Sequence, residues 1–433
     1  MDLKHFGLQW VSDENWSVHD LHLKHYFSAK YKRPSLIFDH TPGIHTLLGP
    51  RRIGKSTQFK LWILELLKQS TSPDEIFYLN AECYESWQEL LKILESITSK
   101  YWFIDEVTAV KDWPRALKIL ADEGRFESRT VWITGSNAFD LKNLGERLPG
   151  RRGHSLVCRD IELLPLTFRE FYLATKNHFN TGVDAIFEKF CQWGGYPMAV
   201  SECLQLSEPS FDLLQEMVDV FLGETSRKHR SPRLTAALAE VLWLQLGSRS
   251  SYNALAKAVD AGSHPILKQY VEILEGCYAL MTVERYNQKT HRGVVKKEKK
   301  FYFLDSLTMG ALSSFSETGI VQSSWFKKNW ENLTFQGRWI ENIVASEFRK
   351  QGIEVFYDMR YGMEIDFIWK LPSLESNDLK AVEVKRSVPS QLEIRGLKEF
   401  RKGEVWIYQF PATPPQNRPE LKPLLEMLLL EEF

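Results

Sequence analysis

The stretch Gly49-Pro50-Arg51-Arg52-Ile53-Gly54-Lys55-Ser56 matches the pattern G-x-x-x-x-G-K-[ST]. A short apolar run at residues 44–48 precedes it and a helical pattern at residues 57–68 follows it, which is the context that the pattern requires. Glycines allow such a loop to wrap tightly, so that backbone N–H groups point at phosphate oxygens and the helix N-terminus adds its positive end. The stretch therefore predicts a phosphate-binding loop, and its placement disfavours a chance glycine loop.

The side chains of this loop have distinct expected roles. Lys55 is expected to reach the β- and γ-phosphates of a bound nucleotide, and the Ser56 hydroxyl to ligate Mg²⁺. The candidate cofactors are thus ATP and Mg²⁺. The full set of predicted nucleotide contacts in the loop is Gly49, Arg52, Ile53, Gly54, Lys55, Ser56 and Thr57.

An acidic pair ends a second apolar run. Tyr101-Trp102-Phe103-Ile104 leads into Asp105 and Glu106. We expect Asp105 to hold the Mg²⁺ shell and Glu106 to orient or deprotonate the attacking water. A further run at 130–133 ends in Thr134-Gly135-Ser136-Asn137, whose polar groups are candidates to sense the γ-phosphate, although a simple turn explains them equally well.

Length and composition limit the remaining possibilities. The chain has 433 residues, enough for two to four domains. Lys and Arg number 55 against 56 Asp and Glu, so a nucleic-acid surface must be a local basic patch. The five cysteines form no C-x-x-C pair, which argues against a zinc ribbon and favours a reducing compartment. Without an apolar leader or a run approaching 18 apolar residues, we expect a cytoplasmic protein with no membrane partner.

The pattern of apolar runs predicts the domain organisation. Runs at 44–48, 76–79, 101–104 and 130–133 alternate with helical stretches, which is typical of a parallel α/β sheet. Residues 164–225 are expected to be mainly helical, and the basic run 227–233 is a candidate linker. The predicted parts are an N-terminal segment at 1–33, an α/β core at 34–163, a helical lid at 164–233, a winged helix at 234–305 and a C-terminal α/β domain at 306–433.

The predicted winged helix combines two short helices with a basic loop. Residues 251–259 and a helix opened by Pro265 resemble a helix-turn-helix, and two strands at 280–286 and 301–304 are expected to enclose the loop. From residue 285 to 300, seven Lys or Arg residues minus Glu298 give a charge of +6. This segment predicts contact with DNA phosphates. The alternative is a solvated loop on a module that packs internally.

A second group of charged residues lies near the end of the chain. Alternation along a strand places Glu364 and Asp366 on one face of one run, and Glu383 and Lys385 on one face of the next. In a hairpin, Asp366 and Glu383 would converge to hold Mg²⁺ while Lys385 acts on the attacking water. Glu341, on a predicted helix, is the candidate third carboxylate. The alternative is a strand pair with a surface salt bridge.

Taken together, these motifs resemble those of the prokaryotic AAA-type ATPases related to archaeal ORC/Cdc6-like P-loop proteins. The resemblance rests on GPRRIGKST, FIDEV, ITGSN, LPGRR, LLPLTFREF and GGYP, and it runs from about residue 46 to 385. It implies a sensor position at Thr134, Ser136 and Asn137. It also makes Arg151 or Arg152 a candidate arginine finger, although a solvated loop is an equal alternative.

The family resemblance extends to the C-terminal part. Members commonly carry a winged helix and a restriction-endonuclease-like domain. Asp366 and Glu383-Val384-Lys385 resemble the PD-(D/E)xK motif, with Ile365 in place of the proline. The resemblance implies an ATP-dependent DNA-processing enzyme in which Mg²⁺-dependent ATP hydrolysis accompanies DNA binding and phosphodiester cleavage. The alternative is a nucleotide-switched regulator that binds DNA or a protein and has an inactive nuclease-like domain. An oligomer is compatible with either.

Overall fold

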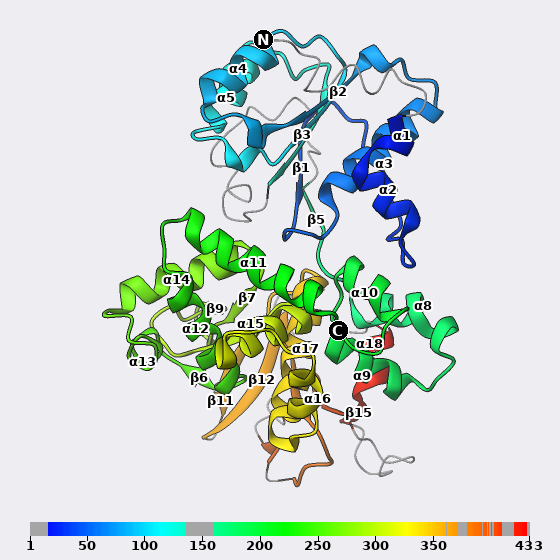
Figure 1. Cartoon of the computed structure of the whole chain (residues 1–433). Helices are drawn as coiled ribbons and strands as arrows, with labels where there is room; N and C mark the ends of the chain where they lie inside the picture. Colours follow the sequence, from blue (N-terminus) through cyan, green and yellow to red (C-terminus); the bar gives the residue numbers. More distant parts are fainter. Residues whose placement is uncertain are drawn as a thin grey trace. The chain divides into compact units, whose positions relative to one another are not determined.

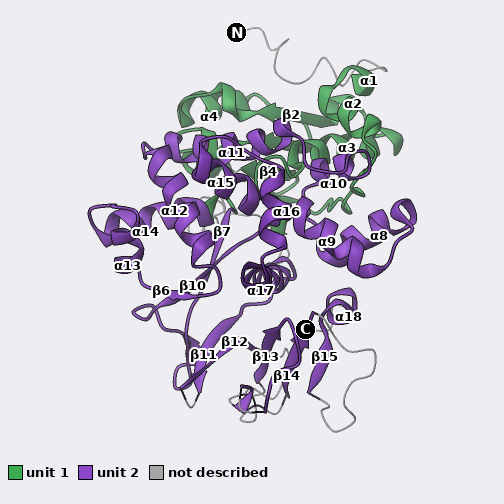
Figure 2. Ribbon diagram, turned by 60° about the horizontal axis from the view of Figure 1, so that its bottom comes forward, with its two compact units in different colours: residues 1–164, 276–278 green, residues 165–275, 279–433 purple. Residues whose placement is uncertain are grey.

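The structure is a computed structural model (Figure 1). It describes residues 16–135, 160–360, 362–370, 379–391, 393–395, 397, 400, 402–408 and 420–430. Contacts within the chain divide it into two compact units, coloured in Figure 2. Unit 1 contains residues 1–164 and 276–278, and unit 2 contains residues 165–275 and 279–433.

Unit 1 is built on a parallel sheet in the order β2-β3-β4-β1-β5. This confirms the predicted parallel α/β core, and the four predicted strands appear within two residues of their expected bounds. The fifth strand, β5, was not predicted from the sequence. The strands are β1 (Gly43–Leu48), β2 (Ile76–Asn80), β3 (Tyr101–Asp105), β4 (Thr130–Gly135) and β5 (Asp160–Glu162); the helices are α1 (Trp16–His19), α2 (Leu21–Ser28), α3 (Lys55–Lys68), α4 (Trp87–Glu95) and α5 (Pro114–Asp122).

Alternating side chains of the central strands fill two cores. On one face of the sheet, Trp102 and Ile104 of β3 pack in a buried cluster with α4 and α5. On the other face, Phe103 and Trp132 pack against the aromatic side chains of α3, with the Trp62 and Trp132 ring centroids 4.7 Å apart. Because both faces are covered, the strands are apolar throughout. This packing fixes the carboxyl ends of β1, β3 and β4 side by side.

The first part of unit 2 is helical, as the sequence predicted. The Thr167 side chain accepts a hydrogen bond from the Glu170 N–H, and the Glu170 carboxylate accepts one from the Thr167 N–H, so the two residues form a capping box at the start of α8. Across the whole of unit 2, the described helices are α8 (Phe168–Phe179), α9 (Val183–Trp193), α10 (Pro197–Cys203), α11 (Phe211–Arg227), α12 (Pro232–Leu244), α13 (Tyr252–Ala258), α14 (His264–Gly276), α15 (Ser306–Thr318), α16 (Ser324–Trp330), α17 (Leu333–Lys350) and α18 (Leu424–Leu430).

Two further sheets belong to unit 2 and position the charged residues near the end of the chain. One has the order β6-β10-β7 and is antiparallel, and the other has the order β11-β12-β13-β14-β15. A short hairpin, β8-β9, lies in the sequence between β7 and β10. The strands are β6 (Arg249–Ser250), β7 (Leu280–Val283), β8 (Tyr286–Asn287), β9 (Arg292–Gly293), β10 (Lys299–Phe303), β11 (Phe356–Arg360), β12 (Met363–Lys370), β13 (Leu379–Lys385), β14 (Lys402–Ile407) and β15 (Leu421–Pro423).

The predicted C-terminal hairpin is present. β12 and β13 pair in antiparallel fashion, with Phe367 opposite Val382 and Ile368 opposite Ala381. Apolar residues of β12, β13 and β14 form a buried cluster on this sheet. The finer division of unit 2 into a lid, a winged helix and a C-terminal domain stays a prediction.

Candidate functional site

The phosphate loop follows β1 and depends on two glycines. Gly49 has a φ of +147°, and a Cβ atom there would lie 2.2 Å from the backbone oxygen of Leu163. Gly54 has a φ of +101° and forms the N-cap of α3. A side chain at either position would be strained, because L-residues rarely adopt such angles. The two glycines therefore allow the sharp loop that delivers the chain to the N-terminus of α3.

Lys55 folds back onto this loop. Its Nζ atom donates hydrogen bonds of 3.0 Å to the backbone oxygens of Gly49 and Pro50, and it lies 3.8 Å from Oε1 of Glu106. The side chain is buried. The predicted phosphate-binding lysine and the predicted catalytic carboxylate thus lie at one place, although they come from different elements of the sheet.

The acidic pair is held by the neighbouring strands. Thr134, near the end of β4, donates a hydrogen bond of 2.5 Å to Oδ1 of Asp105 and accepts one of 2.9 Å from the backbone N–H of Glu106. From β2, the Tyr78 hydroxyl donates a bond of 2.9 Å to Oδ2 of Asp105. Both carboxylate oxygens of Asp105 therefore have a fixed partner.

Glu106 carries backbone strain and an altered acidity. Its φ is +52°, in the left-handed region that non-glycine residues rarely occupy, and such strain is often found at functional sites. Burial raises the pKa of Glu106 above the ordinary value, and the charge of Lys55 only partly opposes this effect. A carboxyl group with a raised pKa is better suited to accept a proton near neutral pH.

The structure brings together four predicted site residues, Lys55, Asp105, Glu106 and Thr134. Of the others, Ser56 and Thr57 lie half-buried in the first turn of α3, Ile53 is buried and Arg52 is exposed. Ser136, Asn137, Arg151 and Arg152 lie outside the described residues. Sequence reasoning missed Tyr78, since nothing in an apolar strand signals a role for one hydroxyl.

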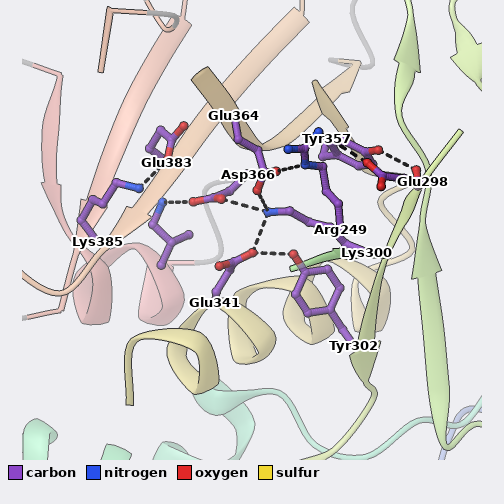
Figure 3. Close-up of polar contacts among 11 residues, drawn as sticks. Arg249, Glu298, Lys300, Tyr302, Glu341, Tyr357, Glu364, Asp366, Glu383 and Lys385 are labelled. Carbon is purple, nitrogen blue, oxygen red and sulfur yellow. Dashed lines mark hydrogen bonds and ion pairs between the residues drawn. The ribbon is translucent and has the colours of Figure 1, made fainter. Parts of the chain in front are cut away.

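A second cluster of charged residues lies in unit 2 (Figure 3). The predicted residues converge: Lys385 Nζ lies 2.7 Å from Oε2 of Glu383, and the backbone N–H of Val384 donates a bond of 3.0 Å to Oδ2 of Asp366. Glu341 approaches from α17. The side chains of Asp366 and Glu383 are buried, so this is not the surface salt bridge that was the alternative interpretation.

A further lysine lies in the middle of this cluster. Nζ of Lys300 lies 2.9 Å from Oε1 of Glu341, 2.6 Å from Oε1 of Glu364 and 3.1 Å from Oδ1 of Asp366. The Tyr302 hydroxyl donates a bond of 2.5 Å to Glu341. Both residues belong to β10. Sequence reasoning placed Lys300 in a DNA-contacting loop and had no signal for these contacts.

The cluster shifts the acidity of its members. Burial raises the pKa of Glu341 to about 7, and the negative charge of Asp366 adds to this effect. Burial and then the charge of Asp366 raise the pKa of Glu383 well above the ordinary value. Burial acts against ionisation of Asp366 as well, but the charges of Lys300 and Lys385 outweigh it and lower the pKa of that carboxyl. Asp366 is therefore the member held in its charged form.

The basic segment from residue 285 to 300 requires a correction. Lys299 and Lys300 are buried and paired with carboxylates, Lys299 with Glu284 at 2.5 Å, and Arg285 lies 3.6 Å from Asp358. The exposed charges are those of Lys289, Arg292, Lys296 and Lys297 against Glu298, which gives four minus one, or +3 instead of +6. The two lysines were expected in the loop, but strand pairing in β10 places them inside the protein.

Among the described residues, no group of three or more His, Cys, Asp and Glu side chains is arranged to hold a metal ion. Within the same residues, every helix is too short or too polar to cross a membrane.

Comparison with protein families identifies the first domain. Residues 41–172 match a family described as an AAA domain, and residues 184–319 match a family described as a domain of unknown function (DUF8612). No curated protein matches the chain. Residues 41–172 are therefore similar to an AAA domain, in agreement with the phosphate loop and the parallel sheet of unit 1. Neither match extends past residue 319, so the restriction-endonuclease-like domain stays a prediction.

Several of the similar solved structures are of archaeal proteins. A Walker-type ATPase of Pyrococcus abyssi has a TM-score of 0.45 and 16% identity, covering 65% of this chain and 98% of its own. The ORC1 protein of Aeropyrum pernix, solved in complex with DNA, has a TM-score of 0.30 and 13% identity, covering 73% and 98%. Cdc6p of Pyrobaculum aerophilum has a TM-score of 0.27 and 13% identity, covering 74% and 95%. Likeness at this level carries no conclusion about function.

Proposed function

We propose that the chain hydrolyses ATP at the phosphate loop of unit 1. The observation that carries this proposal is the meeting of Lys55 and Glu106 at 3.8 Å beside the anchored Asp105. A cation for the phosphates and a carboxylate for the water are the two parts that phosphoryl transfer to water needs most.

Each residue has a task in this proposal. The Lys55 ammonium group exchanges its hydrogen bonds to the backbone oxygens of Gly49 and Pro50 for bonds to the β- and γ-phosphates, which are charged and therefore stronger acceptors. The Ser56 hydroxyl and the Asp105 carboxylate are oxygen ligands of the kind that Mg²⁺ prefers, and they would hold this ion, which neutralises phosphate charge when bound. Glu106 accepts the proton of the attacking water. Thr134 keeps both acids in place.

The test of this proposal is nucleotide turnover by purified protein. Wild-type protein should release phosphate from ATP only when Mg²⁺ is present, and Lys55→Ala should abolish both nucleotide binding and turnover. The matched control is Lys60→Ala. Lys60 is a buried lysine on the same helix, and its side chain contacts Asp20 instead of the phosphate loop. Equal turnover in wild type and Lys55→Ala would exclude this site.

We infer that unit 2 binds DNA through the module at residues 234–305. The order α12-β6-α13-α14-β7-β10, with β6-β10-β7 as one sheet, is the order expected of a winged helix. The exposed lysines Lys296 and Lys297 lie just before β10, where phosphates can reach them. Direct measurement of binding to duplex DNA at several salt concentrations tests this inference.

The carboxylate cluster supports phosphodiester cleavage as the second activity. Asp366 and Glu383 come from paired strands, and Lys385 lies beside them with a third of its side chain exposed. Here the two acids would hold Mg²⁺ and Lys385 would orient or deprotonate water. Asp366→Asn and Lys385→Ala should abolish cutting of plasmid DNA while ATP hydrolysis continues. Absence of cutting by wild type would favour the alternative, a nucleotide-switched regulator with an inactive nuclease-like domain, whereas cutting that Asp366→Asn leaves intact would come from another active site or a contaminating nuclease.

A further inference from the structure

The Lys300 side chain occupies the centre of the candidate nuclease cluster. Figure 3 shows its ammonium group between Glu341, Glu364 and Asp366, at 2.9, 2.6 and 3.1 Å. None of the Lys300 side chain is exposed, whereas 29% of the Glu364 side chain is. The lysine is therefore an internal component of the site.

The partners of Lys300 come from a different sheet and from a helix. Lys300 lies in β10 and pairs with Val283 of β7 and Arg249 of β6. Glu364 and Asp366 lie in β12, and Glu341 lies in α17. The contact thus joins the sheet β6-β10-β7 to the carboxylates of the C-terminal sheet, within unit 2.

Other polar contacts hold this strand in place. The Asn342 side chain accepts a bond of 2.7 Å from the N–H of Phe303 and donates one of 3.0 Å to the oxygen of the same residue. Arg249 lies 2.8 Å from Glu364. These bonds hold β10 against α17, and because none of the Lys300 side chain is exposed, we expect its release to require β10 to move from α17 and β12.

The ammonium group competes with a divalent cation for the same oxygens. Oδ1 of Asp366 faces the Lys300 ammonium group, and Oδ2 accepts the N–H of Val384, so the positive charge lies beside Oδ1. Mg²⁺ requires close to six oxygen ligands at about 2.0–2.1 Å, and a positive charge at hydrogen-bonding distance from a ligand oxygen weakens its attraction for a second cation.

We propose that Lys300 is an intramolecular cation that replaces a metal ion in this cluster, and that divalent metal binds there only when β10 withdraws. The proposal rests on the nuclease site proposed above and adds its regulation. A direct catalytic role for Lys300 is disfavoured by burial, because a group with no exposed surface cannot touch a phosphodiester. Lys385 is the lysine of the cluster that reaches solvent.

Mn²⁺ binding to nucleotide-free protein tests this proposal by calorimetry. Lys300→Met should bind Mn²⁺ about tenfold more tightly than wild type or better, because the competing charge is gone. Adding Asp366→Asn to this variant should abolish the gain. The matched control is Lys299→Met, which removes the adjacent buried lysine whose partner is Glu284. Equal Mn²⁺ affinity in wild type and Lys300→Met would overturn the proposal.

A second measurement uses unaltered protein and applies if Lys300→Met does not fold. Mn²⁺ should speed hydrogen exchange of the β10 amides, since the metal must expel the ammonium group. Exchange that is unaffected by Mn²⁺ at any concentration would overturn the proposal.

DNA cleavage is read separately from metal binding. If Lys300→Met binds Mn²⁺ more tightly but neither wild type nor Lys300→Met cuts plasmid DNA, the proposed role of Lys300 is supported and the nuclease assignment is wrong. If wild type and Lys300→Met both cut plasmid DNA and bind Mn²⁺ with equal affinity, the nuclease assignment is supported and the proposed role of Lys300 is wrong.

Discussion

The Thr134 hydroxyl lies 2.5 Å from Oδ1 of Asp105 and donates a hydrogen bond to it, 29 positions away in the sequence. The oxygen of this hydroxyl accepts the N–H of Glu106 at 2.9 Å. Because β3 and β4 are paired, one hydroxyl at the end of β4 orients both acidic residues at the end of β3. The predicted sensor residue is thus also a support for the predicted metal ligand and base.

Thr134→Val should reduce ATP turnover about tenfold, and Thr134→Ser should retain it. Valine keeps the shape but removes the donor to a buried carboxylate, a type of bond that contributes about 1.5–3 kcal/mol. Phosphate release at saturating ATP and Mg²⁺ measures the effect on turnover, and urea unfolding measures the effect on stability. Unchanged turnover in Thr134→Val would contradict the supporting role.

Glu106→Gln should bind ATP and hydrolyse it at least about tenfold more slowly, since a general base contributes roughly 10²–10⁴ in rate. Glutamine keeps the size of the side chain and its left-handed backbone but cannot accept the proton. Nucleotide affinity and single-turnover hydrolysis are measured on the same preparation. The control is Glu82→Gln, an exposed acid near the loop. Turnover at the wild-type level would show that Glu106 is not the base.

Gly49→Ala should destabilise unit 1 by about 1–3 kcal/mol and weaken nucleotide binding. The new methyl group would overlap the oxygen of Leu163, and the φ of +147° would itself be strained. Gly223→Ala is the control, because a Cβ there meets no atom within 4 Å and alanine favours its helix by about 0.5–1 kcal/mol. The prediction is wrong if Gly49→Ala melts at or above the wild-type temperature.

Lys296→Ala combined with Lys297→Ala should flatten the salt dependence of DNA binding. For each DNA phosphate that the variant no longer neutralises, the slope of log affinity against log salt should become shallower by about 0.9. Lys327→Ala with Lys328→Ala on α16 removes two exposed lysines elsewhere and should leave the slope unchanged. If both double variants have the same slope, Lys296 and Lys297 do not contact DNA phosphates.

The stability of metal-free protein should fall with rising pH because of Glu341. Its pKa is about 7 in the folded chain against 4.5 for the ordinary group, since burial disfavours the charge. Between these values the unfolded chain binds fewer protons than the folded chain, so the free energy of unfolding decreases as pH rises, by up to about 1.4 kcal/mol per pH unit.

Glu341→Gln should remove this loss, so its stability relative to wild type should grow from pH 5 to pH 7.5. Urea unfolding in the presence of a chelator measures the difference. Glu331→Gln, an exposed acid two residues before α17, controls for the change in net charge. A constant difference between Glu341→Gln and wild type across this range would contradict the raised pKa.

Sequence patterns predicted the features that depend on neighbouring residues. The strand, loop and helix around Lys55 follow from a run of apolar residues, two glycines and a helical period, each of which acts over a few positions. The hairpin of Asp366 and Glu383 likewise follows from alternation along two strands. The convergence of Glu106 with Lys55, and of Asp366 and Glu383 with Lys385, was therefore predictable.

Other features depend on which distant segments pack together, and the tertiary structure decided them. A hydroxyl in β2 reaches Asp105, and a short strand far along the chain joins the edge of the sheet beside β1. A pattern of apolar residues specifies that a strand is buried but not which strand lies next to it.

Lys300 illustrates the difference most clearly. The sequence alone determined that residues 285–300 are rich in positive charge, and for such a segment exposure to solvent is the ordinary expectation. Only the tertiary structure decided that this ammonium group is buried, because Glu341 and Asp366, 41 and 66 positions away, supply the opposite charges that offset the cost of leaving water. That compensation arises only when β10, α17 and β12 are packed together.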